Sequence, residues 1–233
     1  MKLGTNKLIR KSHRYLGIFL GVQFLLWTIS GMYFSWTEID EIHGDQFIAD
    51  EISEIAFESL LSPTQIVGKE KIKSIELRVI ADQPYYWIDD EALYNAQNGE
   101  YKSEINRADA IGIAQKHIKA GFEIKDILRI TTVGKHHEYR GRPLPAYVVS
   151  YEHPENLKAY ISAKDGSFQR IRHRSWRWFD FLWMTHTMDY QGRDNFNTIL
   201  LRVFSLMGLI TVSSGFLLWF VSSATIRKIK KTV

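Results

Sequence analysis

The stretch LGIFLGVQFLLWTISGMYFSW, residues 16–36, decides the fold together with its counterpart ILLRVFSLMGLITVSSGFLLWFV, residues 199–221. A bilayer core about 30 Å thick takes roughly 20 apolar residues in a helix. The first stretch has no charged residue between Gly17 and Phe34, and the second has only Arg202. The two stretches therefore predict two transmembrane helices.

Basic residues flank both predicted spans on their outer sides, without an acidic residue among them. They are Lys2, Lys7, Arg10, Lys11 and Arg14 before the first span, and Arg227, Lys228, Lys230 and Lys231 after the second. Because short Lys/Arg-rich flanks stay in the cytoplasm, we expect both termini there and residues 37–198 outside. Removing these 9 from the 30 Lys and Arg leaves 21 against 26 Asp and Glu. The net charge of +4 thus reflects topology and not nucleic-acid binding.

The first span is expected to stay attached as a signal anchor. Its apolar run exceeds a normal signal-peptide core and ends in bulky residues, Met32 to Trp36, with no small-x-small cleavage site after it. The chain has no cysteine, which excludes disulfides, covalent c-type haem and Cys-ligated zinc or iron–sulfur clusters. Any metal or haem must be held by His, Met or carboxylate.

The segment between the spans is duplicated. Residues 92–101 resemble residues 159–168 at an offset of 67, and each copy alternates apolar residues before Asn98-Gly99 or Asp165-Gly166. This pattern predicts a β-hairpin whose glycine supplies a positive φ. Each copy is therefore expected to contain an antiparallel sheet, in units spanning residues 37–105 and 106–175.

A helix and a further strand are predicted upstream of each hairpin. Ser62-Pro63 precedes a helix over 64–69 and a strand over 75–80. Asn106 caps a helix over 107–120, followed by strands over 124–132 and 146–151. The second copy is longer, and Gly141, Pro143 and Pro145 place its insertion in residues 136–145. The predicted fold class is a membrane α+β protein: two transmembrane helices bracket two units, each with an antiparallel sheet and a helix.

Short motifs also recur in the two spans. Ser30-Gly31 in the first parallels Ser214-Gly215 in the second, and the first also carries Gly17-x-x-x-Gly21. Small residues let membrane helices approach closely. These faces are expected either to pack the two spans together or to build a dimer.

These features together resemble the PepSY-associated transmembrane family. The resemblance rests on residues 13–17 (HRYLG), Ser30-Gly31, the two hairpins, and the tract from Trp183 through His186 and Arg202 to Trp219. It implies a bacterial inner-membrane protein with PepSY-like periplasmic repeats. Larger members have four spans and include haem-b reductases of ferric siderophores. The predicted segments are a cytoplasmic start 1–15, a span 16–36, two repeats 37–105 and 106–175, an aromatic interfacial segment 176–198, a span 199–221 and a basic tail 222–233.

His186 is the leading candidate for a cofactor or metal ligand. It lies in the aromatic tract 176–190, which holds three of the seven tryptophans. Trp and Tyr favour the membrane interface, so the tract is either an interfacial helix with an exposed histidine or the wall of a haem b site with His186 on the iron. The resemblance adds support to the haem interpretation.

His13 and His173 are the other two candidates. A span of 21 residues rises about 31 Å, so His13 and His186 cannot ligate one iron within one chain. A second ligand would come from another subunit or from His173. Two sites, one near each membrane face, would provide an electron path in a homodimer. Alternatively, His13 helps to set topology, and the Arg residues of 173–178 anchor the outer domain to the bilayer or bind phosphate or haem propionate.

The remaining residues give little support to other chemistry. His136 and His137 are expected in a solvated loop, since neighbours on a strand point to opposite faces. No phosphate-binding glycine loop, HExxH or hydrolase nucleophile motif occurs. The leading hypothesis is a haem-b electron-transfer or ferric/siderophore reductase component. The alternatives are a non-enzymatic periplasmic binding module and an accessory subunit of a larger membrane complex.

Overall fold

The computed structural model describes residues 3–50, 55–68 and 71–222 and divides them between two compact units. The first unit comprises residues up to Thr37 and those from Asp180 onward, and the second comprises Glu38–Phe179. The basic residues Lys2, Arg227, Lys228, Lys230 and Lys231 lie outside the described residues.

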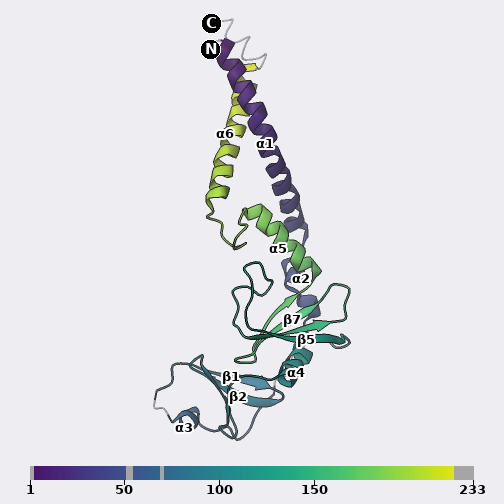
Figure 1. The fold of residues 1–233 in the computed structure, drawn as a ribbon, viewed down its shortest axis with the longest axis vertical. Helices are drawn as coiled ribbons and strands as arrows, with labels where there is room; N and C mark the ends of the chain where they lie inside the picture. Colours follow the sequence, from purple (N-terminus) through teal and green to yellow (C-terminus); the bar gives the residue numbers. More distant parts are fainter. Residues whose placement is uncertain (1–2, 51–54, 69–70, 223–233) are drawn as a thin grey trace. The chain divides into compact units, whose positions relative to one another are not determined.

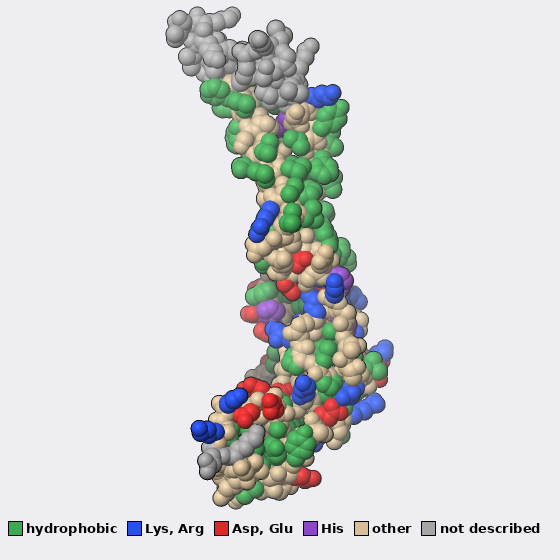
Figure 2. Space-filling view, turned by 60° about the vertical axis from the view of Figure 1, so that its left-hand side comes forward, with side chains coloured by type: hydrophobic (Ala, Val, Ile, Leu, Met, Phe, Trp, Pro, Cys, Tyr) green, Lys and Arg blue, Asp and Glu red, His purple; other side chains and the backbone are tan. Residues whose placement is uncertain are grey.

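The first unit is built on two long helices that run side by side (Figure 1), α1 (Leu3–Trp36) and α6 (Ile199–Ser222). Residues 10–36 and 199–220 are long and apolar enough to cross a membrane. Their hydrophobic side chains gather on the surface of these helices (Figure 2), and Ile18, Val22 and Leu209 are each more than 60% exposed. Such side chains favour lipid over water, which confirms the membrane part of the predicted fold class.

The two spans pack through glycines of α6. A Cβ on Gly208 would lie 3.0 Å from Cζ of Phe24, and Phe19 stacks on Phe204 with ring centroids 5.7 Å apart. By contrast, a Cβ on Gly17 or Gly21 would meet no described atom within 4 Å. The expectation that the spans pack together is confirmed, but within the chain the Gly17-x-x-x-Gly21 face takes no part.

The second unit contains two four-stranded antiparallel sheets in plain meander order. Its described elements are α2 (Ile39–His43), the 3₁₀ turn η1 (Asp45–Phe47), α3 (Pro63–Val67), β1 (Ile75–Ile80), β2 (Gln83–Ile88), β3 (Ala92–Asn95), β4 (Tyr101–Lys102), α4 (Arg107–His117), β5 (Ile124–Ile130), β6 (Ala146–Tyr151), β7 (Lys158–Ser162) and β8 (Phe168–Arg172). Helix α5 (Arg174–Thr187) begins in this unit and ends in the first. The two predicted α+β repeats are confirmed.

The duplication extends to individual backbone hydrogen bonds. In the first repeat the Gly99 N–H donates to Asn95 O and the Ala96 N–H to Pro84 O. In the second, the Gly166 N–H donates to Ser162 O and the Ala163 N–H to Pro145 O. Gly99 and Gly166 both have positive φ, 76° and 69°. The predicted Asn-Gly and Asp-Gly turns are thus confirmed as equivalent structures.

One hydrophobic core serves both repeats. Ile80, Trp87 and Leu93 of the first sheet share a buried cluster with α4 and with the inner face of the second sheet. A Cβ on Gly166 would lie 3.1 Å from Ile80 and 3.2 Å from Ile113, so the second hairpin turn packs closely against the first sheet and α4. Because the core is continuous between them, the repeats are parts of one folded unit.

The second helix ends earlier than its predicted end at residue 120. Asn106 caps α4 through a capping box with Asp109, as expected, but the helix stops at His117. Residues beyond it pair with residues 47–49 instead, since the Ala49 N–H donates to His117 O and the Lys119 N–H to Phe47 O. Long-range pairing here outweighs local helix propensity. The predicted first helix, 64–69, is likewise short, and Lys69 lies outside the described residues.

The insertion of the second repeat is the loop between β5 and β6. Only Ala81 and Asp82 separate β1 from β2, whereas residues 131–145 separate β5 from β6. Tyr139 of this loop is fully buried and stacks on Tyr160 with centroids 4.7 Å apart. The insertion, predicted at residues 136–145, therefore covers the second face of the second sheet.

Candidate functional site

His186 lies in the last turn of α5 and contacts α1 in the first unit. Its Nδ1 is 2.7 Å from Oγ of Ser30, and its backbone oxygen accepts a hydrogen bond of 2.8 Å from the indole N–H of Trp27. One residue earlier, Thr185 O accepts from the side-chain amide of Gln23 at 3.3 Å. Three side chains of α1 thus hold the end of α5.

The neighbours of Ser30 fix the tautomer of His186. The Ser30 hydroxyl donates its single proton to the carbonyl oxygen of Leu26, 2.7 Å away, or of Trp27, 3.1 Å away. The hydrogen between Ser30 and His186 must then come from the imidazole Nδ1–H. In the neutral ring, Nε2 therefore carries the free lone pair, which is the form that binds a metal.

Aromatic rings surround His186. The ring of Phe34 stands edge-on to it at 5.5 Å between centroids, and Trp27 lies at 6.4 Å. Phe34 also contacts Trp183, which in turn contacts Phe196. Burial lowers the pKa of His186 from its ordinary value, so the surroundings favour the neutral ligand form.

The loop after His186 is held by a buried carboxylate. Asp189 accepts hydrogen bonds from the backbone N–H groups of Gln191, Gly192, Asp194 and Asn195. Within the same unit, Arg193 forms an ion pair with the buried Asp180 of α5. These contacts join the end of α5 to the segment that leads into α6, so His186 is positioned from both sides.

His13 has an equivalent environment near the other end of α1. Its Nδ1 is 2.8 Å from Oγ of Ser214 on α6, and the Ser214 hydroxyl donates to Thr211 O at 2.7 Å. Because the single proton of Ser214 goes to Thr211 O, the proton between Ser214 and His13 comes from Nδ1 of His13. Its Nε2 then keeps a free lone pair. The same arrangement, a serine that accepts from Nδ1–H, therefore favours the same tautomer in both histidines.

Space is provided beside His13. A Cβ on Gly215 would lie 3.2 Å from Cε1 and 3.9 Å from Nε2 of the ring, so the glycine makes room for the imidazole. Next to it an apolar groove of about 470 Å³ is lined by Val212, Gly215, Phe216 and Trp219. Gly215 is thus shared between the space beside His13 and the apolar groove on α6.

The two Ser–His pairs lie at different levels of the same helix. His13 and Ser30 are 17 residues apart in the continuous α1, which corresponds to about 26 Å along its axis. His13 and His186 therefore cannot share one metal ion within the chain, as the sequence arithmetic indicates. The geometry defines two separate sites.

His173, the third candidate, lies in the core of the second unit. It is 1% exposed, its ring packs on Phe47 at 5.2 Å, and its Nε2 is 3.2 Å from Ile42 O. Since a carbonyl only accepts, Nε2 carries the proton and donates it. Burial lowers the pKa of His173. Its metal-binding nitrogen Nδ1 is also buried, 3.9 Å from Oε2 of Glu155.

The arginines next to His173 form contacts with other residues of the second unit. Arg177 binds Glu138 through two nitrogens at 2.6 and 3.2 Å, and Arg174 donates to Pro154 O at 2.7 Å. Arg172 lies 3.9 Å from the ring centre of Trp176, a cation–π contact. Arg174 and Arg177 thus attach the start of α5 to loops of the second repeat.

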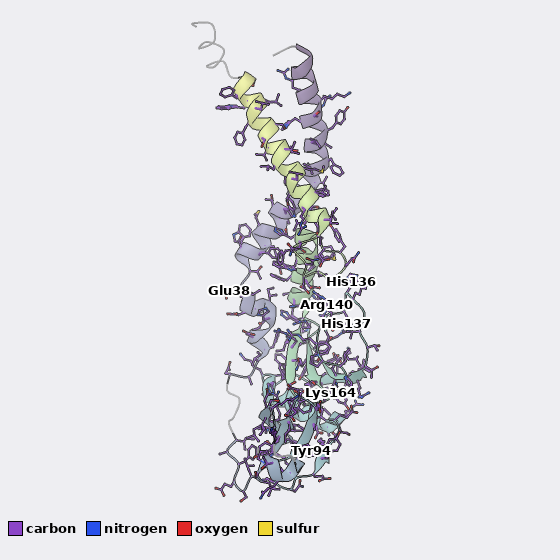
Figure 3. All side chains as sticks on the ribbon, turned by 90° about the vertical axis from the view of Figure 1, so that its left-hand side faces the viewer. Glu38, Tyr94, His136, His137, Arg140 and Lys164 are labelled. Atoms are coloured by element: carbon purple, nitrogen blue, oxygen red, sulfur yellow. The ribbon has the colours of Figure 1, made fainter. Side chains whose placement is uncertain are left out.

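His136 and His137 lie with Arg140 on the loop between β5 and β6 (Figure 3). His136 is exposed, and His137 Nδ1 accepts a hydrogen bond from the Tyr139 N–H at 3.0 Å. The expectation of a loop for this pair is confirmed. Within the described residues no group of three His, Asp or Glu side chains is arranged to hold a metal ion.

Two residues of these sites, Ser30 and Ser214, were not predicted as functional. In the sequence, their Ser-Gly motifs indicate only that the two spans are similar to each other. Each motif has a serine that contacts a histidine from another helix, and Gly215 also makes room for one. The signal was thus present in the repeated dipeptide, but the pairing partners lie 156 and 201 residues away in sequence.

Two apolar helices that bracket tandem α+β repeats, with paired Ser–His contacts along the helices, define a membrane-anchored repeat protein. The model of the PepSY-associated TM region matches residues 2–222, and the chain belongs to this family. No curated protein and no solved structure matches the chain closely enough to count as a relative.

Proposed function

We propose that this protein carries electrons through the membrane on haem b, which His186 and His13 would hold at separate sites. The carrying observation is that Nδ1 of each histidine lies 2.7 or 2.8 Å from a serine hydroxyl, and that each serine is also within hydrogen-bonding distance of a carbonyl oxygen of its own helix. Histidines that ligate a metal characteristically donate their other N–H in this way, which fixes the ring and raises the basicity of the ligand.

The chemistry of the surroundings fits a haem. Imidazole nitrogen is a haem ligand available to a chain without cysteine. The neighbours of His186 are aromatic, namely Phe34 and Trp27, with Trp183 next to Phe34, and Gly215 beside His13 also lines an apolar groove with Val212, Phe216 and Trp219. Bound haem would supply reversible one-electron oxidation and reduction. The chain would hold the ligands, exclude water and separate the sites along α1.

Each site offers one histidine from this chain. We therefore propose that another subunit would help to hold the haem at each site, for which the equivalent histidine of a second copy is one source. His173 is not included, because its Nε2–H is bound to Ile42 O and its Nδ1 is enclosed in the core. The proposal thus rests on His186 and His13 alone.

The predicted orientation from the basic flanks supports a direction for the proposed transfer. With both termini in the cytoplasm, the His13 site lies towards the cytoplasmic face and the His186 site towards the periplasmic face. We propose that one electron at a time passes outward from a cytoplasmic-side reductant and reduces Fe³⁺ to Fe²⁺, free or held by a siderophore. The repeat domain would then face the iron compound.

The test is the visible spectrum of the full chain, expressed with ample haem and purified in mild detergent. We expect a Soret band and, after reduction, an α-band, with haem content halved in His186→Ala and in His13→Ala and lost in the double variant. His136→Ala is the matched control, since His136 is exposed on a loop. Full haem content in both single variants, or no haem in the parent protein, would refute the proposal.

A further inference from the structure

The β1 edge of the first sheet is regular, whereas the corresponding β5 edge of the second sheet is interrupted. Among the described strands, β1 and β5 hold the same edge position in the two repeats, each paired on one side only. The β5 edge is interrupted by a register shift between Ile124 and Asp126 and carries Lys125. Bulges and charges of this kind protect an edge from pairing with another chain. In β1 all six residues keep regular register with β2, without a bulge.

The backbone of β1 presents hydrogen-bonding groups at this edge. The Asp89 N–H donates to Ser74 O at 3.0 Å, at the position that continues the register of Ile75 opposite Ile88 by one pair. Because such pairs alternate along an antiparallel ladder, Glu76, Arg78 and Ile80 bond to β2, while the N–H and C=O groups of Ile75, Leu77 and Val79 point outward. At this edge the backbone N–H and C=O groups of three residues are therefore available to pair with another strand.

The side chains of these three residues are apolar and exposed. Ile75 is 45% exposed, Leu77 47% and Val79 36%. On the same face, Tyr86 is buried opposite Leu77, in a cluster that Ile66 and Val67 of α3 cover. The covering helix thus protects the inner strands and leaves the β1 row uncovered. An extended apolar edge of this type is a template for strand addition.

The charges of β1 indicate what would pair with it. On the opposite face Glu76 and Arg78 alternate, and Arg78 is held by Glu76 and by Asp165 at 3.3 Å. In an antiparallel pair of two β1 strands, the free groups match only if odd residues face odd residues. Centring on Glu76 or on Arg78 places like charges opposite each other. Centring on Leu77 places Glu76 opposite Arg78 of the second strand, twice.

We infer that β1 is a dimerisation edge, at which two copies of this chain pair their β1 strands antiparallel about Leu77. Ile75 of each copy faces Val79 of the other, which covers both exposed rows and makes one continuous eight-stranded sheet. The self-complementary order Ile-Glu-Leu-Arg-Val, residues 75–79, satisfies hydrophobic, charge and hydrogen-bonding requirements in this one register.

The absence of cysteine allows a direct test in membranes that contain the full-length protein. Leu77→Cys places two thiols opposite each other, within the Cα separation that a disulfide spans. We expect mild oxidation to convert it to a covalent dimer. Ile75→Cys, which faces Val79 and not itself, and Tyr101→Cys on β4 at the other edge are expected to stay monomeric. Equal cross-linking in all three, or none in Leu77→Cys, would overturn the inference.

Charge exchange tests the register. Glu76→Arg and Arg78→Glu, each alone, place like charges across the pair, and we expect roughly tenfold weaker self-association of each purified variant. A mixture of the two restores opposite charges at both positions and should associate as the parent does. Circular dichroism checks folding of Arg78→Glu, which also loses its contact with Asp165. Failure of the mixture to associate would exclude the Leu77-centred register. If an extended peptide of another protein is found bound at this edge, a second copy of the chain is excluded as its occupant. Haem content is unaffected in either case, so this result is independent of the proposed function.

Discussion

Ser30 and His186 are joined by a hydrogen bond of 2.7 Å between Oγ and Nδ1, although they come from different helices. The pair has a counterpart in Ser214 and His13, at 2.8 Å. In each, the serine proton is engaged by a carbonyl of the preceding turn, so the serine can only accept from the histidine. The serines therefore act on the ligands and would not bind the cofactor themselves.

Removing Ser30 should weaken haem binding without abolishing it. Ser30→Ala keeps the His186 imidazole but removes its acceptor, and loss of such a partner costs about 10–100-fold in metal affinity. Haem titration of the purified apoprotein measures the affinity, and a redox titration of the loaded protein should show a changed midpoint potential. The matched control is Ser35→Ala, because Ser35 bonds only to its own helix, at Met32 O. Identical titrations for both variants would remove Ser30 from the site.

Adding a methyl group to Gly215 should disturb the packing of the spans. In Gly215→Ala the new Cβ would lie 3.2 Å from the His13 ring, and overpacking of this kind costs about 1–3 kcal/mol. Gly21→Ala on α1 is the control, because its Cβ meets no described atom within 4 Å. Thermal unfolding in detergent compares the two. A lower midpoint for Gly21→Ala than for Gly215→Ala would contradict the observed packing.

The Glu138 cluster should stabilise the second unit. Glu138 binds Arg177 and accepts from the Tyr160 hydroxyl at 2.6 Å, and its side chain is 12% exposed. Breaking a buried pair by removing one partner costs about 3–5 kcal/mol, so we expect a loss near the lower limit for Glu138→Ala. The exposed pair of Lys125 and Glu152 supplies the control, since Glu152→Ala should cost less than about 1 kcal/mol. Denaturant unfolding of both variants provides the comparison.

Acid should destabilise the second unit in two steps. Burial lowers the pKa of His173 and of His117 below the ordinary 6.5. The unfolded chain then takes up protons first, so stability is complete above pH 6.5 and falls as the pH drops below it. Burial would raise the pKa of Glu138, but Arg177 and Tyr160 hold it below 4.5, so its contribution is present above that pH and lost below it.

Unfolding midpoints measured from pH 8 to 4 should therefore decline below 6.5 and more steeply near 4. In His173→Gln the first decline should be smaller, because one of the three histidines of this unit whose pKa burial lowers is gone. A midpoint that rises between pH 6.5 and 5 would contradict the sign of both histidine shifts.

The proposed orientation can be tested by labelling single cysteines. Lys164→Cys, on the exposed turn after β7, should react with a membrane-impermeant maleimide from outside intact cells, and Lys11→Cys should react only after the cells are opened. The chain has no other thiol to interfere. The reverse pattern would invert the topology and with it the proposed direction of electron flow.

Much of the architecture could be predicted from residues close together in sequence. Apolar length set the spans, Asn-Gly and Asp-Gly set the equivalent turns at Gly99 and Gly166, and Asn106 set the start of α4. These features depend on interactions within one element or turn, so local sequence is sufficient. The predicted end of α4 at residue 120 was wrong, because the observed end at His117 depends on pairing with residues 47–49.

The sequence by itself determined that the chain has two helices long and apolar enough to cross a membrane and a duplicated α+β domain between them. It also determined that His13 and His186 are too far apart for one iron, since helix rise is a fixed length per residue. Only the tertiary structure decided that Ser30 and Ser214 hold those histidines, that His173 belongs to the core, and that β1 keeps an open edge. Those facts depend on contacts between residues separated by many positions, and only packing in three dimensions selects them.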